Sequence, residues 1–462
     1  MTYEQFLKNK KKIVQFKSID IQRNELNNAL FEYQKDLVYL ALKKGHFALF
    51  AMTGSGKTAM QGEFAYQVWK AEQKPVLILA PLAVSHQTIN EIKNILGYDV
   101  HFCATQNDVK NGINITNYEK LEHFDASAFI AIILDESSIL KSFTSKMRDL
   151  IIEQFKGTPY KLACSATPAP NDHMELGNHS EFLNVMSRTE MLSMFFVHDG
   201  GDTAKWRLKG HAKDKFWEFV ASWSAVFTKP SDLGYDEKED AKFQLPTKER
   251  FEYIVHSTST KSLFAVHAET LNDRRQAKRD SLEDRCNVVA DLVNNSDEIW
   301  LVWCELNTES EMLSKMIRDC VEVTGSDSDE HKTKAMHDFA QGKIKCLVTK
   351  AKIAGFGMNW QVCHNVAYAS ISDSFEQFFQ SERRVYRYGQ KQKVNVHVVT
   401  SEAEGSIKDN LARKEEDFIL MINEVAKYTK ESTLKEIKQV SIVKTDYNPQ
   451  VEMKIPNFLK AS

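Results

Sequence analysis

The stretch FALFAMTGSGKTAM, residues 47–60, decides the fold of this chain. Residues 47–52 are apolar and bounded by turn formers, as in a buried strand, and the apolar residues after Thr58 recur with helical spacing. A glycine-rich turn between a strand and a helix suits phosphate, because glycines let backbone N–H groups approach phosphate oxygens at the helix N-terminus. The stretch therefore predicts the phosphate loop of a nucleotide-binding α/β domain.

Within this loop, Lys57 is expected to reach the terminal phosphates, and the Thr58 hydroxyl is expected to bind Mg²⁺. The residues predicted to cradle the nucleotide are Thr53, Gly54, Ser55, Gly56, Lys57 and Thr58. The general pattern has glycine where this chain has Ala51. The loop thus predicts a nucleoside triphosphate and Mg²⁺, but it leaves open what the triphosphate drives.

Composition narrows the possible partners. The chain has 462 residues, with 60 Lys and Arg against 63 Asp and Glu, so a nucleic-acid surface must be a local patch rather than a property of the whole molecule. Its seven cysteines are scattered, which favours buried reduced thiols in a cytosolic protein. The N-terminus lacks an apolar signal core, and no apolar run approaches the length of a membrane span, so we expect a soluble, cytoplasmic protein without membrane contact.

Short apolar segments alternate with helical patterns in two sets, which predicts two lobes with parallel sheets flanked by helices. The first set of expected strands is 47–52, 75–81, 113–116, 129–136 and 161–167. The second set is 298–304, 320–325, 345–350, 364–370 and 395–400. The predicted division is lobe 1 over 1–172, an aromatic-rich insertion over 173–228, a linker over 229–246, lobe 2 over 247–404 and a charged tail over 405–462.

The insertion and the tail differ from the two lobes in composition and in predicted structure. The insertion is expected to contain a hairpin at VHDGGDTAKWRL and a helix with Phe216, Val220, Trp223 and Phe227 on one face. Helical spacing favours a small core over a base-stacking platform for these aromatics. The tail after Gly405 is expected to be helical and to end as a partly mobile arm.

An acidic pair, Asp135 and Glu136, offers the two carboxylates that ATP hydrolysis needs beside a phosphate loop. Asp135 ends an apolar run, as a carboxylate that organises Mg²⁺ should, and Glu136 follows as the candidate general base. Ser165 and Thr167 stand at the end of another strand, where their hydroxyls could bond to the acidic pair and sense the γ-phosphate. A local turn is the alternative interpretation of this Ser-Ala-Thr-Pro sequence.

The second half of the chain contributes arginines. Arg384 and Arg387 are three residues apart in QSERRVYRYGQ and share a face if this segment is helical. A solvated basic helix would show the same pattern. Beside a phosphate loop and an acidic pair, however, the arginines are better explained as groups that reach a nucleotide held by the first lobe.

In order, AMTGSGKT, LAPLAVSHQ, ITNYEKL, LDESS, SATP, GFGMN and QSERRVYRYGQ resemble the motifs of superfamily-two helicases over most of residues 31–400. The last of them is similar to the Q-x-x-D-R-x-x-R-x-G-Q of Swi/Snf-type DNA translocases. This resemblance implies two tandem RecA-like lobes. The lack of long insertions, with the stretch APNDHMELGNHSEF, resembles the compact versions found in phages and prophages.

The resemblance also implies roles for single residues. Tyr33 and Gln34 would read the adenine, Lys57, Asp135, Glu136, Arg384 and Arg387 would be catalytic, and Gly357 and Asn359 would contact the nucleotide. Pro81, Thr116, Asn117 and Lys352 would touch the nucleic-acid backbone, and Ser165, Thr167 and Gln380 would couple the lobes. The chain departs from the Swi/Snf pattern at DESS, at SATP, at Arg383 in place of Asp and at Tyr386 in place of His.

These features predict an ATP-dependent motor that moves along double-stranded DNA without sequence preference, acting as a monomer with ATP and Mg²⁺ in the cleft. A strand-separating helicase on branched or single-stranded DNA or RNA is the alternative within enzymes. A clamp that binds nucleotide and nucleic acid without hydrolysis is the alternative outside them. The presence of Lys57, Glu136 and Arg387 argues against the clamp.

Overall fold

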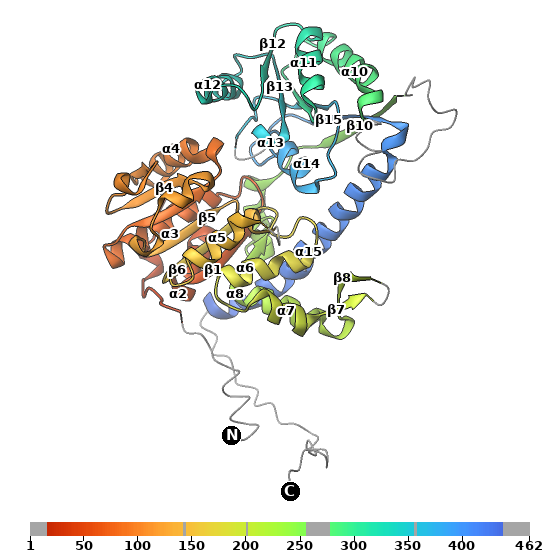
Figure 1. Ribbon diagram of the computed structural model, residues 1–462. Helices are drawn as coiled ribbons and strands as arrows, with labels where there is room; N and C mark the ends of the chain where they lie inside the picture. The colour runs from red at the N-terminus through yellow and green to blue at the C-terminus, as the bar shows by residue number, and fades with distance from the viewer. Residues whose placement is uncertain (1–15, 142–144, 200–201, 256–277, 355–357, 438–462) are drawn as a thin grey trace, which may run out of the picture.

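The structure is a computed structural model that describes residues 16–141, 145–199, 202–255, 278–354 and 358–437. It contains two α/β lobes, each built on a parallel sheet with helices on its faces (Figure 1). The two-lobe RecA-like fold predicted from the sequence is confirmed. The predicted domain boundaries stay predictions.

The sheet of lobe 1 has the strand order β3-β4-β2-β5-β6-β1-β9, and all its pairs are parallel. Most of its strands are apolar and buried on both faces, because helices cover both sides. Its strands are β1 (His46–Ala51), β2 (Val76–Ala80), β3 (Val100–Phe102), β4 (Ile113–Asn117), β5 (Ala131–Asp135), β6 (Tyr160–Ser165) and β9 (Ser224–Phe227). Its main helices are α2 (Glu32–Lys44), α3 (Lys57–Glu72), α4 (Ser85–Leu96), α5 (Lys146–Gln154), α6 (Leu176–Phe182), α7 (Arg188–Phe195) and α8 (Lys213–Trp223).

The sheet of lobe 2 has the strand order β10-β15-β14-β11-β13-β12 and is parallel throughout. Its strands are β10 (Lys248–Val255), β11 (Trp300–Cys304), β12 (Cys320–Val323), β13 (Cys346–Lys350), β14 (Asn365–Tyr368) and β15 (Val394–Ser401). Its helices are α10 (Leu282–Asn294), α11 (Asn307–Met316), α12 (Asp329–Ala340), α13 (Ala351–Ala354) and α14 (Phe375–Glu382).

All ten strands expected from apolar runs are present, and the predicted hairpin is β7 (Phe196–Asp199) with β8 (Asp202–Leu208). Three further strands, β3, β9 and β10, were not expected. The helix predicted to run through Phe227 is wrong at its end, because α8 stops at Trp223 and Phe227 lies in β9, paired with β1. A short apolar run has no periodicity that distinguishes a helix from a strand, so only its pairing in the sheet shows that it is a strand.

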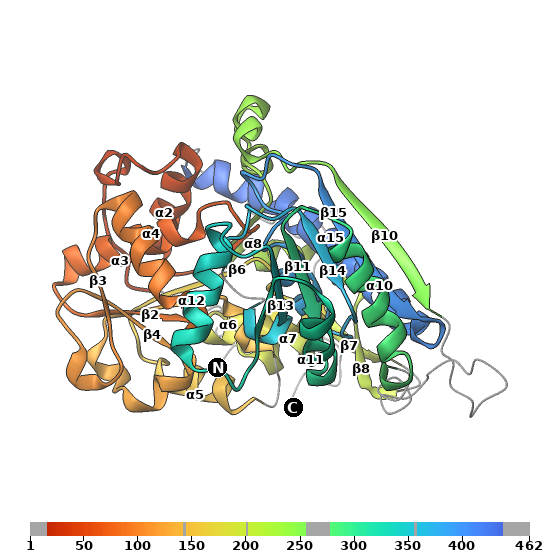
Figure 2. The same ribbon diagram turned by 90° about the horizontal axis from the view of Figure 1, so that it is seen from above.

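The predicted helical tail is α15 (Gly405–Ile437), which leaves lobe 2 and crosses to lobe 1 (Figures 1 and 2). At 33 residues it is about 50 Å long. The Lys414 ammonium donates to Asn171 Oδ1 of lobe 1 at 3.0 Å and to the carbonyl oxygen of Asp373 in lobe 2 at 3.2 Å. Further along, Thr429 Oγ1 accepts from the Val226 amide of the edge strand β9 at 3.4 Å. The tail therefore packs against both lobes.

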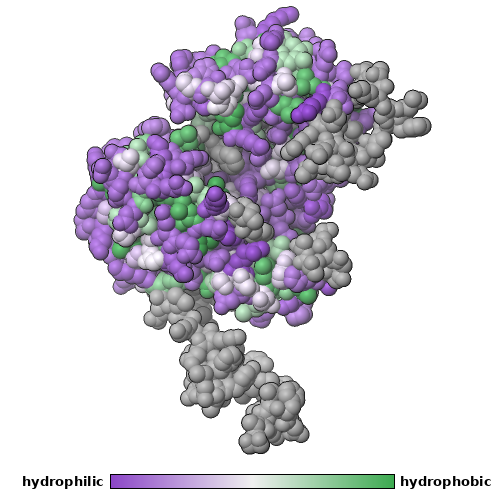
Figure 3. All heavy atoms as spheres, in the orientation of Figure 1, coloured by the Kyte–Doolittle hydropathy of each residue, from purple (hydrophilic) through white to green (hydrophobic). Residues whose placement is uncertain are grey.

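The face shown in Figure 3 is mostly hydrophilic, and its hydrophobic side chains form small, separate patches. Across the described residues, every helix is too short or too polar to cross a membrane. The seven cysteines are free, and six of them are buried.

Candidate active site

Two glycines shape the loop between β1 and α3. Gly54 has a φ of +90° and Gly56 a φ of +82°, a region that L side chains rarely adopt. A Cβ atom on Gly56 would also lie 2.2 Å from Gln34 Nε2. The loop can therefore keep this shape only with glycine at these positions.

Lys57 begins α3 and lies inside the curve of the loop, where its ammonium donates to the Ala51 carbonyl oxygen at 2.7 Å. Burial lowers the pKa of Lys57, and the nearby carboxylates of Glu136 and Asp135 oppose that shift. The lysine is thus next to the acidic pair, in the place that the sequence predicted for a phosphate-binding cation.

Asp135 and Glu136 stand at the C-terminal end of β5, and Glu136 has a φ of +61°. A non-glycine residue in this region carries backbone strain, which is typical of functional sites. Asp135 Oδ1 accepts from Gln61 Nε2 at 2.9 Å. Glu136 Oε1 accepts from the hydroxyls of Ser165 at 2.5 Å and Ser138 at 3.0 Å. The predicted link from Ser165 to the acidic pair is therefore present.

Gln380, on α14 of lobe 2, reaches across to the acidic pair of lobe 1. Its Nε2 donates to Glu136 Oε2 and to Thr167 Oγ1, each at 3.2 Å. On the other side, its Oε1 accepts from Arg384 Nη2 at 3.0 Å, and its carbonyl oxygen accepts from Arg384 Nε at 2.8 Å. One buried amide thus connects the lobe 1 carboxylate with a lobe 2 arginine.

Both predicted arginines lie beside this contact. Arg384 and Arg387 donate to the carbonyl oxygen of Met358 at 3.1 and 3.4 Å. Burial lowers the pKa of Arg384 to about 9, while Glu136 and Asp135 favour its charged form. Arg387 is close enough to Lys57 to depress the pKa of that lysine. Among the described residues, the buried Arg387 Nε has no hydrogen-bond partner. A cationic donor is therefore open next to the phosphate loop.

These residues fit a nucleoside triphosphate with a divalent metal. Burial raises the pKa of Asp135 to about 6, and a bound cation would favour the ionised form. Within the described ranges, three or more His, Cys, Asp or Glu residues never cluster as a metal site. Mg²⁺ needs no such cluster, because one or two protein oxygens and the substrate phosphates hold it. Thr58 and Asp135 are the protein groups available here.

Tyr33 and Gln34 hold the phosphate loop from α2. The Tyr33 hydroxyl donates to the Ser55 carbonyl oxygen at 2.7 Å, and Gln34 Nε2 donates to the same oxygen at 3.0 Å. Gln34 Oε1 accepts from the Phe31 amide at 2.9 Å. Thr53 and Ser55 are themselves buried in the loop. The predicted adenine contact is therefore next to the loop, and its role stays a prediction.

The other predicted nucleotide and nucleic-acid contacts are spread along the ends of strands. Pro81 follows β2 and Asn117 ends the neighbouring β4, so these two lie together at one sheet edge. Thr116 and Asn117 are buried, and Asn117 Oδ1 accepts from the Lys120 amide at 3.1 Å. Lys352 is exposed on α13 of lobe 2. Asn359 is exposed, and Gly357 lies outside the described residues.

Sequence reasoning missed three residues of this site. Gln61 lies one helical turn after Lys57, so the spacing on α3 could have identified it. The Tyr118 hydroxyl donates to the Asp135 carbonyl oxygen at 2.7 Å, and nothing in the sequence pattern indicates this contact. Tyr388, next to Arg387, donates to the Thr228 carbonyl oxygen, and its Cβ lies 3.2 Å from where a side chain on Gly54 would begin. Lobe 2 therefore packs directly on the phosphate loop.

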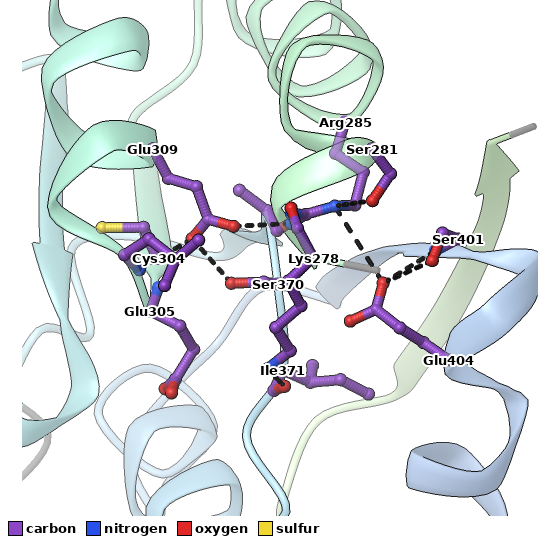
Figure 4. A network of polar contacts seen from close by, with 12 residues as sticks. Lys278, Ser281, Arg285, Cys304, Glu305, Glu309, Ser370, Ile371, Ser401 and Glu404 are labelled. Atoms are coloured by element: carbon purple, nitrogen blue, oxygen red, sulfur yellow. Dashed lines mark hydrogen bonds and ion pairs between the residues drawn. The ribbon is translucent and has the colours of Figure 1, made fainter. Parts of the chain in front are cut away.

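A buried polar network joins α10 and α11 to the segment that follows β14 (Figure 4). Arg285 Nη1 donates to Glu309 Oε1 at 2.7 Å, and the Ser370 hydroxyl donates to Glu309 Oε2 at 2.7 Å. The Lys278 ammonium donates to the carbonyl oxygen of Ile371. Burial opposes ionisation of Glu309, but Arg285 and backbone donors together hold its pKa below the usual range. The network thus anchors residues 370–371, which lead into the helix that carries Gln380.

Two family models match this chain. The model described as type III restriction enzyme, res subunit, matches residues 15–170, and the model described as helicase conserved C-terminal domain matches residues 277–389. A solved structure titled Sulfolobus solfataricus SWI2/SNF2 ATPase core in complex with dsDNA is 17% identical, with a TM-score of 0.42. It covers 92% of this chain and 99% of its own.

Two curated proteins named SWI/SNF-related matrix-associated actin-dependent regulator of chromatin subfamily A-like protein 1 are also similar. The Xenopus tropicalis protein is 24% identical over 84% of this chain and 44% of its own length, and the Xenopus laevis protein is 23% identical over 88% and 45%. The chain thus spans less than half the length of these relatives.

The two family models fall one on each lobe, and the residues predicted for ATP hydrolysis meet between the lobes. The curated relatives are SWI/SNF-related proteins. The chain therefore carries the two domains of a superfamily-two helicase core, one in each lobe, and is similar to SWI/SNF-related proteins.

Proposed function

We propose that this protein is an ATP-dependent motor that moves along double-stranded DNA without sequence preference. The observation that carries the proposal is the composite site, in which Gln380 of lobe 2 bonds to Glu136 and Thr167 of lobe 1. Because the site is complete only when the lobes meet, ATP binding favours closure and hydrolysis releases it. Repeated closure is the motion that a two-lobe motor needs.

In this mechanism Lys57 and the loop amides hold the phosphates, with Thr58 and Asp135 as the groups that would hold Mg²⁺. Bound Mg²⁺ would neutralise charge that develops on the phosphates. Glu136 accepts a proton from the attacking water, and its hydrogen bonds from Ser165 and Ser138 keep the carboxylate oriented. Arg387 supplies positive charge from the second lobe through its open donor.

DNA is the proposed track, contacted through its backbone by Pro81, Thr116 and Asn117 of lobe 1 and by Lys352 of lobe 2. Thr116 and Asn117 are buried as whole residues, whereas Pro81 is partly exposed and Lys352 is exposed, so the last two are the accessible contacts in this arrangement. Such contacts hold a strand without reading its bases. The QSERRVYRYGQ segment and the SWI/SNF-related relatives favour movement on duplex DNA over strand separation. We propose a monomer; origin in a phage or prophage stays a prediction.

The test compares ATPase rates with no nucleic acid, single-stranded DNA, duplex DNA and RNA, followed by two strand-displacement assays. Duplex DNA should stimulate hydrolysis regardless of its sequence, and stimulation should fall steeply with salt as counterion release weakens. The protein should displace the third strand of a triplex and leave a forked duplex paired. Efficient opening of the fork, or stimulation by RNA alone, would replace the translocase with a helicase. Binding of nucleotide and nucleic acid without hydrolysis would favour the non-catalytic clamp.

A further inference from the structure

We propose that Lys141 and Glu376 form an ion pair between the lobes that makes closure of the active site favourable. Lys141 is the last residue of the short helix η6 (Ser137–Lys141), which follows Glu136 directly. Glu376 lies in the first turn of α14, one helical turn before Gln380. The Lys141 ammonium contacts a carboxylate oxygen of Glu376. The pair thus stands beside the contact between Gln380 and Glu136 and joins the same two elements.

The two partners are buried to different extents. The Glu376 side chain is 2% exposed, whereas the Lys141 side chain is 33% exposed. Apart from this ion pair, neither carboxylate oxygen of Glu376 has a polar partner among the residues that the structure describes. Lys141 is therefore the neutralising group for a carboxylate that is deeply buried when the lobes are together.

This asymmetry makes closure depend on the lysine. Taking a carboxylate out of water is strongly unfavourable unless a cation accompanies it. Lys141 also has acidic neighbours within lobe 1, since Glu175 and Glu136 both favour its charged form. When the lobes separate, Lys141 keeps those neighbours and Glu376 of lobe 2 loses this partner. The ion pair therefore stabilises the closed arrangement of the lobes relative to the open one.

The two residues are positioning residues, because they act through Gln380 and Glu136 and need not touch the nucleotide. Their contact sets the separation between η6 and α14, and with it the 3.2 Å bond from Gln380 Nε2 to Glu136 Oε2. The inference rests on the proposed hydrolysis of ATP at this site. The inference goes beyond hydrolysis itself. It states that the buried charge of Glu376 opposes closure of the lobes whenever Lys141 is absent.

The test uses Lys141→Met, Glu376→Gln and the double variant, with Lys334→Met as a control. Lys334 is 78% exposed and pairs with Asp338 on its own helix in lobe 2. Lys141→Met should lower kcat about a hundredfold or more, because it leaves a buried charge without a partner. Glu376→Gln should lower kcat less than about tenfold, since it removes the buried charge. The double variant should hydrolyse ATP at least about tenfold faster than Lys141→Met, and the control should match the parent.

Rescue separates this arrangement from other roles of the lysine. A lysine that touched ATP or DNA would not be rescued by Glu376→Gln, so a double variant as slow as Lys141→Met would overturn the inference. The affinity of Lys141→Met for a non-hydrolysable ATP analogue should fall much less than its kcat, because lobe 1 holds the phosphates, and the double variant should restore this affinity together with kcat. A parent protein without nucleic-acid-stimulated ATPase would instead refute the proposed function, and the two failures are therefore distinguishable.

Discussion

The contact between Gln380 and Thr167 offers a direct test of whether the closed arrangement is the hydrolysing one. Gln380→Met keeps the length of the side chain but removes its polar atoms. Thr167→Val keeps the shape of the threonine but removes the hydroxyl that accepts from Gln380 Nε2 at 3.2 Å. Both side chains are buried, so water does not readily replace the lost bonds. The two variants and their combination form a double-mutant cycle.

The expected magnitudes follow from the charges of the partners. Gln380→Met loses bonds to the Glu136 carboxylate at 3.2 Å and from the Arg384 guanidinium at 3.0 Å. Hydrogen bonds to charged groups contribute about 1.5–3 kcal/mol each, so kcat should fall about 10²- to 10⁴-fold. Thr167→Val loses one neutral bond of about 1 kcal/mol, so kcat should fall only about fivefold.

The assay is nucleic-acid-stimulated ATPase at saturating ATP for all four proteins of the cycle. Thr167→Val should have little further effect once Gln380 is Met, because the bond that it would remove is already absent. The coupling free energy should therefore be about 1 kcal/mol. If the two effects simply add, the contact is not made in the hydrolysing state, and the reasoning from the closed structure is wrong.

Arg387→Ala should lower turnover about 10³- to 10⁵-fold while nucleotide binding survives, and near-parent ATPase in the folded variant would contradict a site shared by both lobes. Glu136→Gln should still bind ATP but hydrolyse it slowly, and it should hold DNA more tightly with ATP than without; hydrolysis at the parent rate would show that another residue is the base. Lys161→Met should raise the thermal unfolding midpoint more at pH 7 than at pH 10. Burial lowers the pKa of Lys161 to about 7, so the unfolded chain binds more protons than the folded one between these pH values, and the stability of the parent rises with pH. An equal gain at both pH values would contradict this explanation.

Local sequence determined the main elements of lobe 1 and indicated its candidate catalytic residues. The run FALFAMTGSGKT specifies a strand, a left-handed glycine turn and a helix start within a few residues, and each step is a local preference. The expected strands are present because continuous apolar runs bury well only between two helical layers. Asp135 and Glu136 were identifiable since strand ends in parallel sheets gather at one edge.

Tertiary structure alone decided how distant segments meet. Phe227 lies in an apolar run that fits a helix or a strand, and only pairing with β1 makes it β9. The partnership of Lys141 with Glu376 and the path of α15 across both lobes depend on the relative position of the lobes, about which local propensities carry no information. The hydrogen bond between Gln380 and Glu136 forms only where the two lobes meet. The sequence by itself therefore predicted the residues that we propose for ATP hydrolysis, and tertiary packing decided that they lie together between the lobes.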